Sequence, residues 1–243
     1  MLKDKPSFPV RLNKYLADHY PVTRRSADTL ITKGKVKING KVAVLGQMVQ
    51  AGDTVKVESK ASRPAYRYFA YHKPIGVATH ASAPSEKAIL NVLRLPIKAF
   101  PIGRLDKDSR GLIILSDDGR LAGALLAPEF KHEKEYVVTT DRTINDANLK
   151  QLAVGVKIEN YHTKKAKTKK IRDKEFSIIL TEGKKHQIRR MCAALSLQVH
   201  DLIRTRIENI ELGKLPAGEV REITGSELVE FLTRLGLQKK TTG

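Results

Sequence analysis

The order of strands and helices in residues 66–237 constrains the fold of this chain more than any other feature of the sequence. Apolar and β-branched runs predict strands at residues 66–71, 111–116, 135–140, 176–180, 199–202 and 207–212. Helical spacing predicts helices at residues 91–95, 121–126, 145–154, 224–235 and within 183–197. Because the strands outnumber the helices and do not alternate with them regularly, we expect an α+β fold. Its sheet should be mixed and mainly antiparallel, with flanking helices, rather than doubly wound.

A smaller pattern of two helices followed by short strands precedes this domain. Apolar residues from Leu12 to Ile31 recur at helical spacing. Asn39 and Gly40 stand between alternating apolar residues, which is a strong signal for a hairpin. Ser, Arg and Pro then mark a linker before the next strand. We therefore expect a small N-terminal α/β domain at residues 9–58, a linker at 59–65 and a larger domain at 66–237.

The charge of the chain points to a polyanionic partner. Lys and Arg number 45 against 26 Asp and Glu, which gives a net charge of +19 at pH 7. A field of this sign attracts nucleic acid, and an anionic membrane surface is the alternative. No apolar run approaches the ~20 residues that a membrane span needs, so the sequence favours nucleic acid.

Several classes of site and compartment find no support in the sequence. Residues 1–7 lack the apolar stretch of a secretory signal, and the single Cys192 cannot form an internal disulfide, which favours a cytoplasmic protein. We find no zinc-site spacing, Walker loop or dinucleotide fingerprint, so we expect neither a metal nor a cofactor. No extended apolar helix face is left unassigned, and we therefore expect a monomer.

Two basic segments are candidate RNA contacts. Arg24 and Arg25 open the second predicted helix, where backbone N–H groups also favour a phosphate. Further along, five lysines occur with no carboxylate among them, in a stretch that suits an exposed β-ribbon. An ordinary solvated face is the alternative for both segments. The candidate residues are Arg24, Arg25, Lys33, Lys35, Lys37, Lys164, Lys165, Lys167, Lys169 and Lys170.

A charged segment at residues 100–112 is the first candidate for chemistry. Asp106 and Asp108 stand among Arg104 and other cations. Neighbouring cations favour the ionised carboxylate, which a nucleophile needs. A charged surface loop is the alternative. A metal-binding pair is another, although no further cluster of ligands completes a coordination shell.

Two more segments carry candidate residues. Tyr136 opens an apolar strand, where it is either a packing residue or a phenol that stacks under a base. In residues 181–192, His186, Arg189 and Arg190 share one face of a predicted helix. Arginines there suit a carboxylate or a phosphate in a semi-buried cleft, and plain surface charge is the alternative.

In this order, the three segments resemble the RsuA-type family of RNA pseudouridine synthases, in its RluF-like branch. The shared strings are Gly103-Arg-Leu-Asp-Lys-Asp-Ser-Arg-Gly-Leu, His132-Glu-Lys-Glu-Tyr and His186-Gln-Ile-Arg-Arg. The resemblance covers residues 9–235, and its first part resembles the S4 RNA-binding domain. Two positions depart from the family pattern, His72 where Asn is usual and the Lys184-Lys185 pair in the loop before the third motif. Both bear on which RNA is held.

The resemblance implies a pseudouridine synthase fold and the isomerisation of uridine in RNA to pseudouridine, with no metal or cofactor. It makes Asp106 the catalytic carboxylate, which either attacks C1′ or takes the C2′ proton. It implies that Tyr136 stacks on the flipped base and that Arg189 pairs with Asp106. Arg104 would fill the space that the base leaves, and Arg190 joins the RNA-binding set. Large-subunit ribosomal RNA is the favoured substrate, ahead of small-subunit ribosomal RNA or tRNA.

Two other functions stay open at this point. A non-catalytic S4-type RNA-binding protein would share the charge and the first domain, but Asp106, Tyr136 and Arg189 together argue against it. A methyltransferase would need a nucleotide-shaped cofactor site, and no glycine-rich strand–turn–helix segment provides one.

Overall fold

The computed structural model describes residues 8–20, 22, 24–58, 66–83, 85–127 and 130–237. The chain forms two compact units that divide near residue 66. The predicted linker at residues 59–65 lies outside the described ranges. In the part of the chain that the structure describes, no helix is long and apolar enough to cross a membrane.

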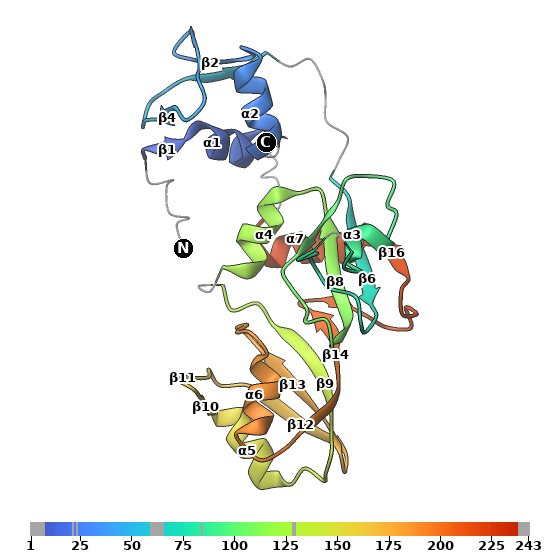
Figure 1. Ribbon diagram of the computed structural model, residues 1–243. Helices are drawn as coiled ribbons and strands as arrows, with labels where there is room; N and C mark the ends of the chain where they lie inside the picture. Colours follow the sequence, from blue (N-terminus) through green and yellow to red (C-terminus); the bar gives the residue numbers. More distant parts are fainter. Residues whose placement is uncertain are drawn as a thin grey trace. The chain divides into compact units, whose positions relative to one another are not determined.

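The first unit places two helices beside short antiparallel strands (Figure 1). Its helices are α1 (Leu12–His19) and α2 (Arg24–Thr32). Its strands are β1 (Val10–Arg11), β2 (Val36–Ile38), β3 (Lys41–Val42), β4 (Met48–Val49) and β5 (Val55–Val57). Asn39 and Gly40 take φ angles of 50° and 82°, the left-handed pair that a two-residue hairpin turn needs. The apolar faces meet in a core that includes Leu16, Ala27 and Val36.

The second unit is built on one large sheet. Its strands are β6 (Tyr68–Lys73), β7 (Phe100–Ile102), β8 (Arg110–Ser116), β9 (Lys134–Thr140), β12 (Lys167–Arg172), β13 (Glu175–Leu180), β14 (Val199–Ile207), β15 (Ile210–Glu211) and β16 (Val220–Glu222). They follow the order β12-β13-β9-β14-β8-β6-β16, with β7 on β8 and β15 on β14. Every pair is antiparallel except β8 with β14. The predicted mixed, mainly antiparallel sheet is therefore confirmed.

Helices cover this sheet and bury its apolar side chains. Helices α5 (Asp146–Val154) and α6 (Gln187–Ala193) lie beside the β9–β13–β12 part (Figure 1). Their core joins Val138 and Phe176 of the sheet to Leu152, Met191 and Cys192 of the helices. The remaining elements are α3 (Ile89–Val92), α4 (Gly119–Leu126), α7 (Gly225–Arg234) and the hairpin of β10 (Lys157–Ile158) with β11 (Tyr161–His162).

The strand β14 differs from the prediction of two separate strands at 199–202 and 207–212. It runs unbroken from Val199 to Ile207, with register shifts against β9 on either side of its middle. Arg204 and Arg206 interrupt the apolar pattern there, which is why the sequence suggested a break. Both guanidinium groups find hydrogen-bond acceptors within the sheet, so the strand continues.

Two helix boundaries also differ from prediction. Helix α3 spans Ile89–Val92 rather than residues 91–95. Leu93 is already extended, with φ −109° and ψ 126°, and Pro96 disfavours helical backbone at Leu95. Thr224 and Glu227 have the sequence spacing of a capping box but do not form one. The Thr224 side chain makes no capping hydrogen bond, and the Glu227 carboxylate instead accepts two hydrogen bonds from Arg221, at 2.6 and 2.7 Å.

Candidate active site

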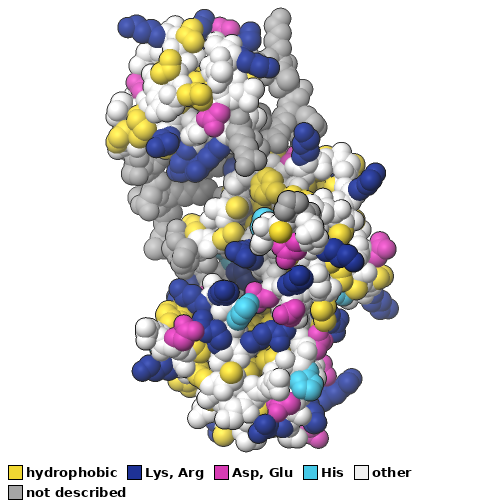
Figure 2. All heavy atoms as spheres, viewed as in Figure 1, with side chains coloured by type: hydrophobic (Ala, Val, Ile, Leu, Met, Phe, Trp, Pro, Cys, Tyr) yellow, Lys and Arg dark blue, Asp and Glu magenta, His cyan; other side chains and the backbone are white. Residues whose placement is uncertain are grey.

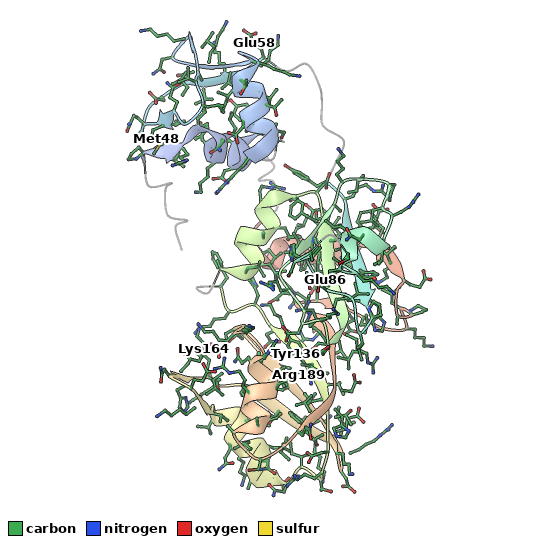
Figure 3. The ribbon with its side chains drawn as sticks, in the orientation of Figure 1. Met48, Glu58, Glu86, Tyr136, Lys164 and Arg189 are labelled. Carbon is green, nitrogen blue, oxygen red and sulfur yellow. The ribbon has the colours of Figure 1, made fainter. Side chains whose placement is uncertain are left out.

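A cavity of about 590 Å³ lies within the second unit, a size typical of pockets that hold small ligands. Asp106, from the loop between β7 and β8, and Tyr136, from β9, both line it. The structure thus brings together two residues that the resemblance assigns to one site. Tyr136 and Lys164, labelled in Figure 3, reach the cavity from β9 and from the loop after β11. Apolar side chains such as Leu202 line the rest of its wall.

The loop that carries Asp106 is held at several backbone atoms. The hydroxyl of Thr79 donates to the Leu105 carbonyl at 2.7 Å and accepts from the Leu105 N–H at 3.0 Å. The N–H of Ser109 closes a turn on the Asp106 carbonyl at 3.0 Å. The side chain of Asp106 is nevertheless 35% exposed, so the carboxylate is accessible from a rigid support.

Lys73 lies beneath this loop and is fully buried. Its ammonium donates to the carbonyls of Val77 at 2.7 Å and Pro74 at 2.9 Å, and more weakly to that of Lys107 at 3.4 Å. Burial lowers the pKa of Lys73 to about 8, although the negative charge of Asp106 acts in the opposite direction. Lys73 thus ties the turn after β6 to the loop that carries the carboxylate.

His186 is the side chain that faces the Asp106 carboxylate. Its Nε2 lies 3.5 Å from Asp106 Oδ1. His186 precedes α6 with a φ of 51°, a left-handed conformation that few residues other than glycine adopt. Such backbone is often found where a side chain must be aimed at a site.

Arg189 does not form the expected ion pair with Asp106 among the residues that the structure describes. Its guanidinium instead donates to the carbonyl of Asp108 at 2.8 Å and to that of Val199 at 3.0 Å. The direct-pairing expectation is therefore wrong, because α6 directs Arg189 to the backbone two residues beyond the carboxylate. Arg189 still connects α6 and β14 to the loop of Asp106.

Sequence reasoning missed two cations of the cavity, Lys134 and Arg204. Lys134 precedes Tyr136 by two residues on β9 and so shares its face of the sheet, a signal that could have found it. Burial, and then the charge of Arg204, lower the pKa of Lys134 to about 8. Arg204 is only 4% exposed and stands opposite Tyr136 on β14. The sequence predicted a break between residues 202 and 207, so it did not place Arg204 on a strand.

The candidate RNA-binding side chains separate into paired and unpaired groups. Lys37, Lys167, Lys170 and Arg190 form ion pairs with Glu58, Glu133, Asp173 and Glu159. Within the described residues, no ion pair involves Arg24, Lys33, Lys35, Arg104, Lys164, Lys165 or Lys169, all of which are exposed. The side chain of Arg25 lies outside the description. Figure 2 shows Lys and Arg side chains gathered on the second unit, over the region of α6 and the β10–β11 hairpin.

The two departures from the family pattern occupy different surroundings. His72 is 6% exposed on β6, and its Nδ1 lies 2.8 Å from the Leu215 carbonyl oxygen. It is therefore a packing position within the sheet. Lys184 and Lys185 are exposed and line the cavity, and the ammonium of Lys184 lies 4.7 Å from the centre of the Tyr161 ring. Of the two departures, only this lysine pair is exposed and lines the cavity.

Comparison with known proteins gives matches along both units. Residues 67–194 match the family described as RNA pseudouridylate synthase, and residues 10–55 match the S4 domain. The dual-specificity RNA pseudouridine synthase RluF of Escherichia coli (strain K12) is 40% identical over 230 residues, which cover 93% of this chain and 79% of the relative. The ribosomal large subunit pseudouridine synthase B of Bacillus subtilis (strain 168) is 35% identical over 228 residues, covering 90% and 93%.

A solved structure extends this similarity to the fold. A crystal structure of a pseudouridylate synthase aligns with a TM-score of 0.67 and 30% identity, over 93% of this chain and 99% of that one. The expected fold is therefore confirmed. The S4 match, together with matches to RNA pseudouridine synthases over nearly the whole chain, supports the synthase over the non-catalytic RNA-binding and methyltransferase alternatives.

Proposed function

The chain belongs to the RNA pseudouridylate synthase family, which isomerises uridine in RNA to pseudouridine, and we propose that its target lies in large-subunit ribosomal RNA. The cavity that Asp106 and Tyr136 line together with exposed lysines is the observation that supports placing this reaction there. The name of the Bacillus subtilis relative supports the choice of RNA. A cytoplasmic monomer fits this function.

Asp106 is the residue to which we assign the bond-breaking step. The reaction breaks the N1–C1′ bond, turns the uracil and rejoins it through C5, so a group must act on the sugar. An ionised carboxylate does this either as a nucleophile at C1′ or as a base at C2′. The 35% exposure of its side chain leaves Asp106 open to a ribose, while the hydrogen bonds behind it hold its position.

The target base has to leave the RNA stack to reach this carboxylate, at a cost of a few kcal/mol. Tyr136 lines the cavity and offers an aromatic surface on which the flipped uracil can stack. Arg104 is exposed in the loop of Asp106, and its planar guanidinium suits the gap left between neighbouring bases. Arg189 acts behind the loop by holding the Asp108 carbonyl.

The basic side chains supply affinity rather than chemistry. Lys164, Lys184 and Lys185 line the cavity, where they can neutralise phosphates on either side of the flipped nucleotide. In the S4 unit, Arg24, Lys33 and Lys35 are exposed, without an ion pair among the described residues. Such contacts orient a structured RNA without reading its sequence.

Mapping of pseudouridines in cells that lack the gene tests this proposal. Ribosomal and transfer RNA would be labelled with carbodiimide and mapped by primer extension, before and after return of the wild type or of Asp106→Asn. We expect one or a few large-subunit sites to be lost and to return only with the wild type. Loss confined to small-subunit RNA or to tRNA would contradict the proposed substrate but not the reaction.

The mapping covers transfer RNA as well as ribosomal RNA, because the name of the Escherichia coli relative states a dual specificity. Loss of a tRNA site together with a ribosomal site would mean that this chain acts on two classes of RNA. Full return of the lost sites with Asp106→Asn would contradict the catalytic assignment of Asp106.

A further inference from the structure

Arg204 is a buried cation for which the described residues provide no acidic partner. Its Nε donates to the Leu112 carbonyl at 2.6 Å, and Nη1 donates to the Arg104 carbonyl at 3.2 Å. Nη2 is buried and has no hydrogen-bond partner within the described ranges. Carbonyl oxygens satisfy two of the donors but do not cancel the charge, so a full positive charge remains in the interior.

Other arginines of the same sheet are neutralised. Arg206 follows Arg204 by two residues on β14, and its guanidinium donates to Glu135 at 2.8 Å and to Glu133 at 3.1 Å. Arg110 of β8 forms a forked pair with Asp201. A buried charge without a counter-charge strongly destabilises the folded state. Stability therefore does not explain an arginine at position 204, and a role in function does.

The sheet fixes Arg204 at the floor of the cavity. Arg204 stands opposite Tyr136 of β9 and Gly111 of β8 in the strand registers. A Cβ atom on Gly111 would lie 2.4 Å from the Arg204 carbonyl oxygen, so only glycine permits this close approach. The guanidinium carbon lies 6.0 Å from the centre of the Tyr136 ring, and Arg204 lines the cavity together with Asp106.

Besides burial, the charge of Arg204 lowers the pKa values of two neighbouring lysines, Lys134 and Lys73. Burial is the main cause of the lowered pKa of Lys134, and Arg204 is the next. The same charge also lowers the pKa of Lys73, after burial and against Asp106 and Asp108. Arg204 therefore lies close enough to Lys134, at the wall of the cavity, for its charge to act there.

The reaction passes through a species that a positive charge nearby would stabilise. When the N1–C1′ bond breaks, its electron pair stays on the uracil, which becomes an anion. C1′ is left either bonded to the carboxylate of Asp106 or, after loss of the C2′ proton, as a glycal. C5 then bonds to C1′ as the bond from C1′ to the Asp106 carboxylate breaks or, in the glycal route, as C2′ regains the proton that Asp106 took. The proton on C5 is lost and N1 gains one, so the product is an isomer of the substrate.

We propose that Arg204 stabilises the uracil anion released from C1′ while the base turns in the cavity. A preorganised charge in a dry site stabilises developing charge without reorganising at the moment of reaction. The Leu112 and Arg104 carbonyls hold the guanidinium in place beside Tyr136, on which the base stacks. This inference rests on the proposed assignment of the cavity as the active site.

Leaving-group dependence provides the test. An RNA with 5-fluorouridine at the target position releases a more stable anion, because fluorine withdraws electrons from the ring. Loss of the target nucleoside is measured after nuclease digestion, in single turnovers at saturating enzyme. We expect Arg204→Met to slow the reaction of uridine by about 100-fold and that of 5-fluorouridine by clearly less. An equal loss on both substrates would overturn the proposal.

Two variants complete the experiment. Arg204→Lys keeps the charge, so its ratio of rates on the two substrates should stay near that of the wild type, even if Arg204→Met does not fold. Arg206→Met removes a neutralised arginine from the same strand and should also leave this ratio unchanged. A shift of the ratio in Arg204→Lys as large as in Arg204→Met would contradict a role for charge. Retained turnover in Asp106→Asn would instead reject the active-site assignment itself.

Discussion

Asp106 owes its position to residues that do not touch its carboxylate. Thr79 holds the backbone immediately before it, and Arg189 holds the carbonyl of Asp108 two residues after it. His186 is the side chain that approaches the carboxylate itself, at 3.5 Å. At the scale of single residues, the site is therefore a supported loop rather than a cluster of paired charges.

Arg189 and Arg190 are adjacent arginines with different surroundings and make a matched pair of variants. In Arg189→Lys, the shorter side chain cannot donate to the carbonyls of both Asp108 and Val199 as the guanidinium does. The loop of Asp106 should therefore be displaced. We expect kcat to fall by roughly 10- to 100-fold with little change in RNA affinity, since a displacement near 1 Å can cost that much. Single-turnover rates and filter-binding affinities would measure the two effects.

Arg190→Gln is the control for this change. Arg190 forms an ion pair with Glu159, and a pair so close to the surface contributes about 0–1 kcal/mol. We expect kcat to stay within about threefold of the wild type, given that small free energy. A loss of turnover in Arg190→Gln equal to that in Arg189→Lys would contradict the special role of Arg189.

Lys73 and Lys134 should titrate near pH 8, far below their usual value of 10.5. Their ammonium groups are desolvated, which favours the neutral form. Between about pH 8 and 10.5 the unfolded chain binds more protons at these positions, so their contribution to the free energy of unfolding rises with pH. NMR of ¹³C-methylated lysines would show two early titrations, one of them absent in Lys134→Arg. Titration of all lysines together near 10.5 would refute this.

Sequence reasoning reached Asp106 and Tyr136 because their motifs are local. It could have reached Lys134 by the alternation of side chains along one strand. It could not have reached the hydrogen bond of Arg189 to Asp108, because the direction of a long side chain depends on how α6 packs against the sheet.

At the scale of elements, β14 is the strand that joins the two parts of the sheet. It pairs antiparallel with β9 and parallel with β8, and so carries Arg204 between the strand of Tyr136 and the loop of Asp106. The pattern of apolar residues predicted β6, β8, β9 and β13 well, since their buried faces alternate or are continuously apolar. It failed for β14 because buried arginines resemble a loop in sequence.

Helix caps offer a prediction at this scale. The Asn145 side chain accepts from the N–H of Asn148 at 2.8 Å, and the Asn148 side chain accepts from the N–H of Asn145 at 3.3 Å. We expect Asn145→Ala to lower the free energy of unfolding by about 1 kcal/mol. Thr224→Ala, at a cap without a side-chain hydrogen bond, should cost less than about 0.5 kcal/mol. Chemical denaturation would rank the two, and a larger loss for Thr224→Ala would contradict the assigned caps.

At the scale of the whole molecule, the chain carries a net charge of +19, and exposed cations occur both in the S4 unit and around the candidate cavity. Composition alone indicated nucleic acid, and the order of elements indicated the fold class. The identity of the target uridine depends on the shape of the RNA against both units, which a pattern of residues does not encode.

The S4 unit should supply salt-sensitive affinity. Replacement of both Lys33 and Lys35 with Ala should weaken RNA binding and reduce the slope of log affinity against log salt by about 1 for each lost phosphate contact. Lys14→Ala is the control, because Lys14 already pairs with Asp18 at 3.5 Å. Affinity titrations at several salt concentrations would measure the slope, and an unchanged slope in the double variant would remove these lysines from the RNA contact.

The most direct test of the account is the turnover of purified Asp106→Asn on its RNA target. The change replaces a carboxylate with an amide of nearly the same shape, so the loop and the cavity should persist. We predict that the variant binds the RNA with wild-type affinity and forms no pseudouridine. Pseudouridine formation at the wild-type rate would contradict the account, because the chemistry would then belong to another residue.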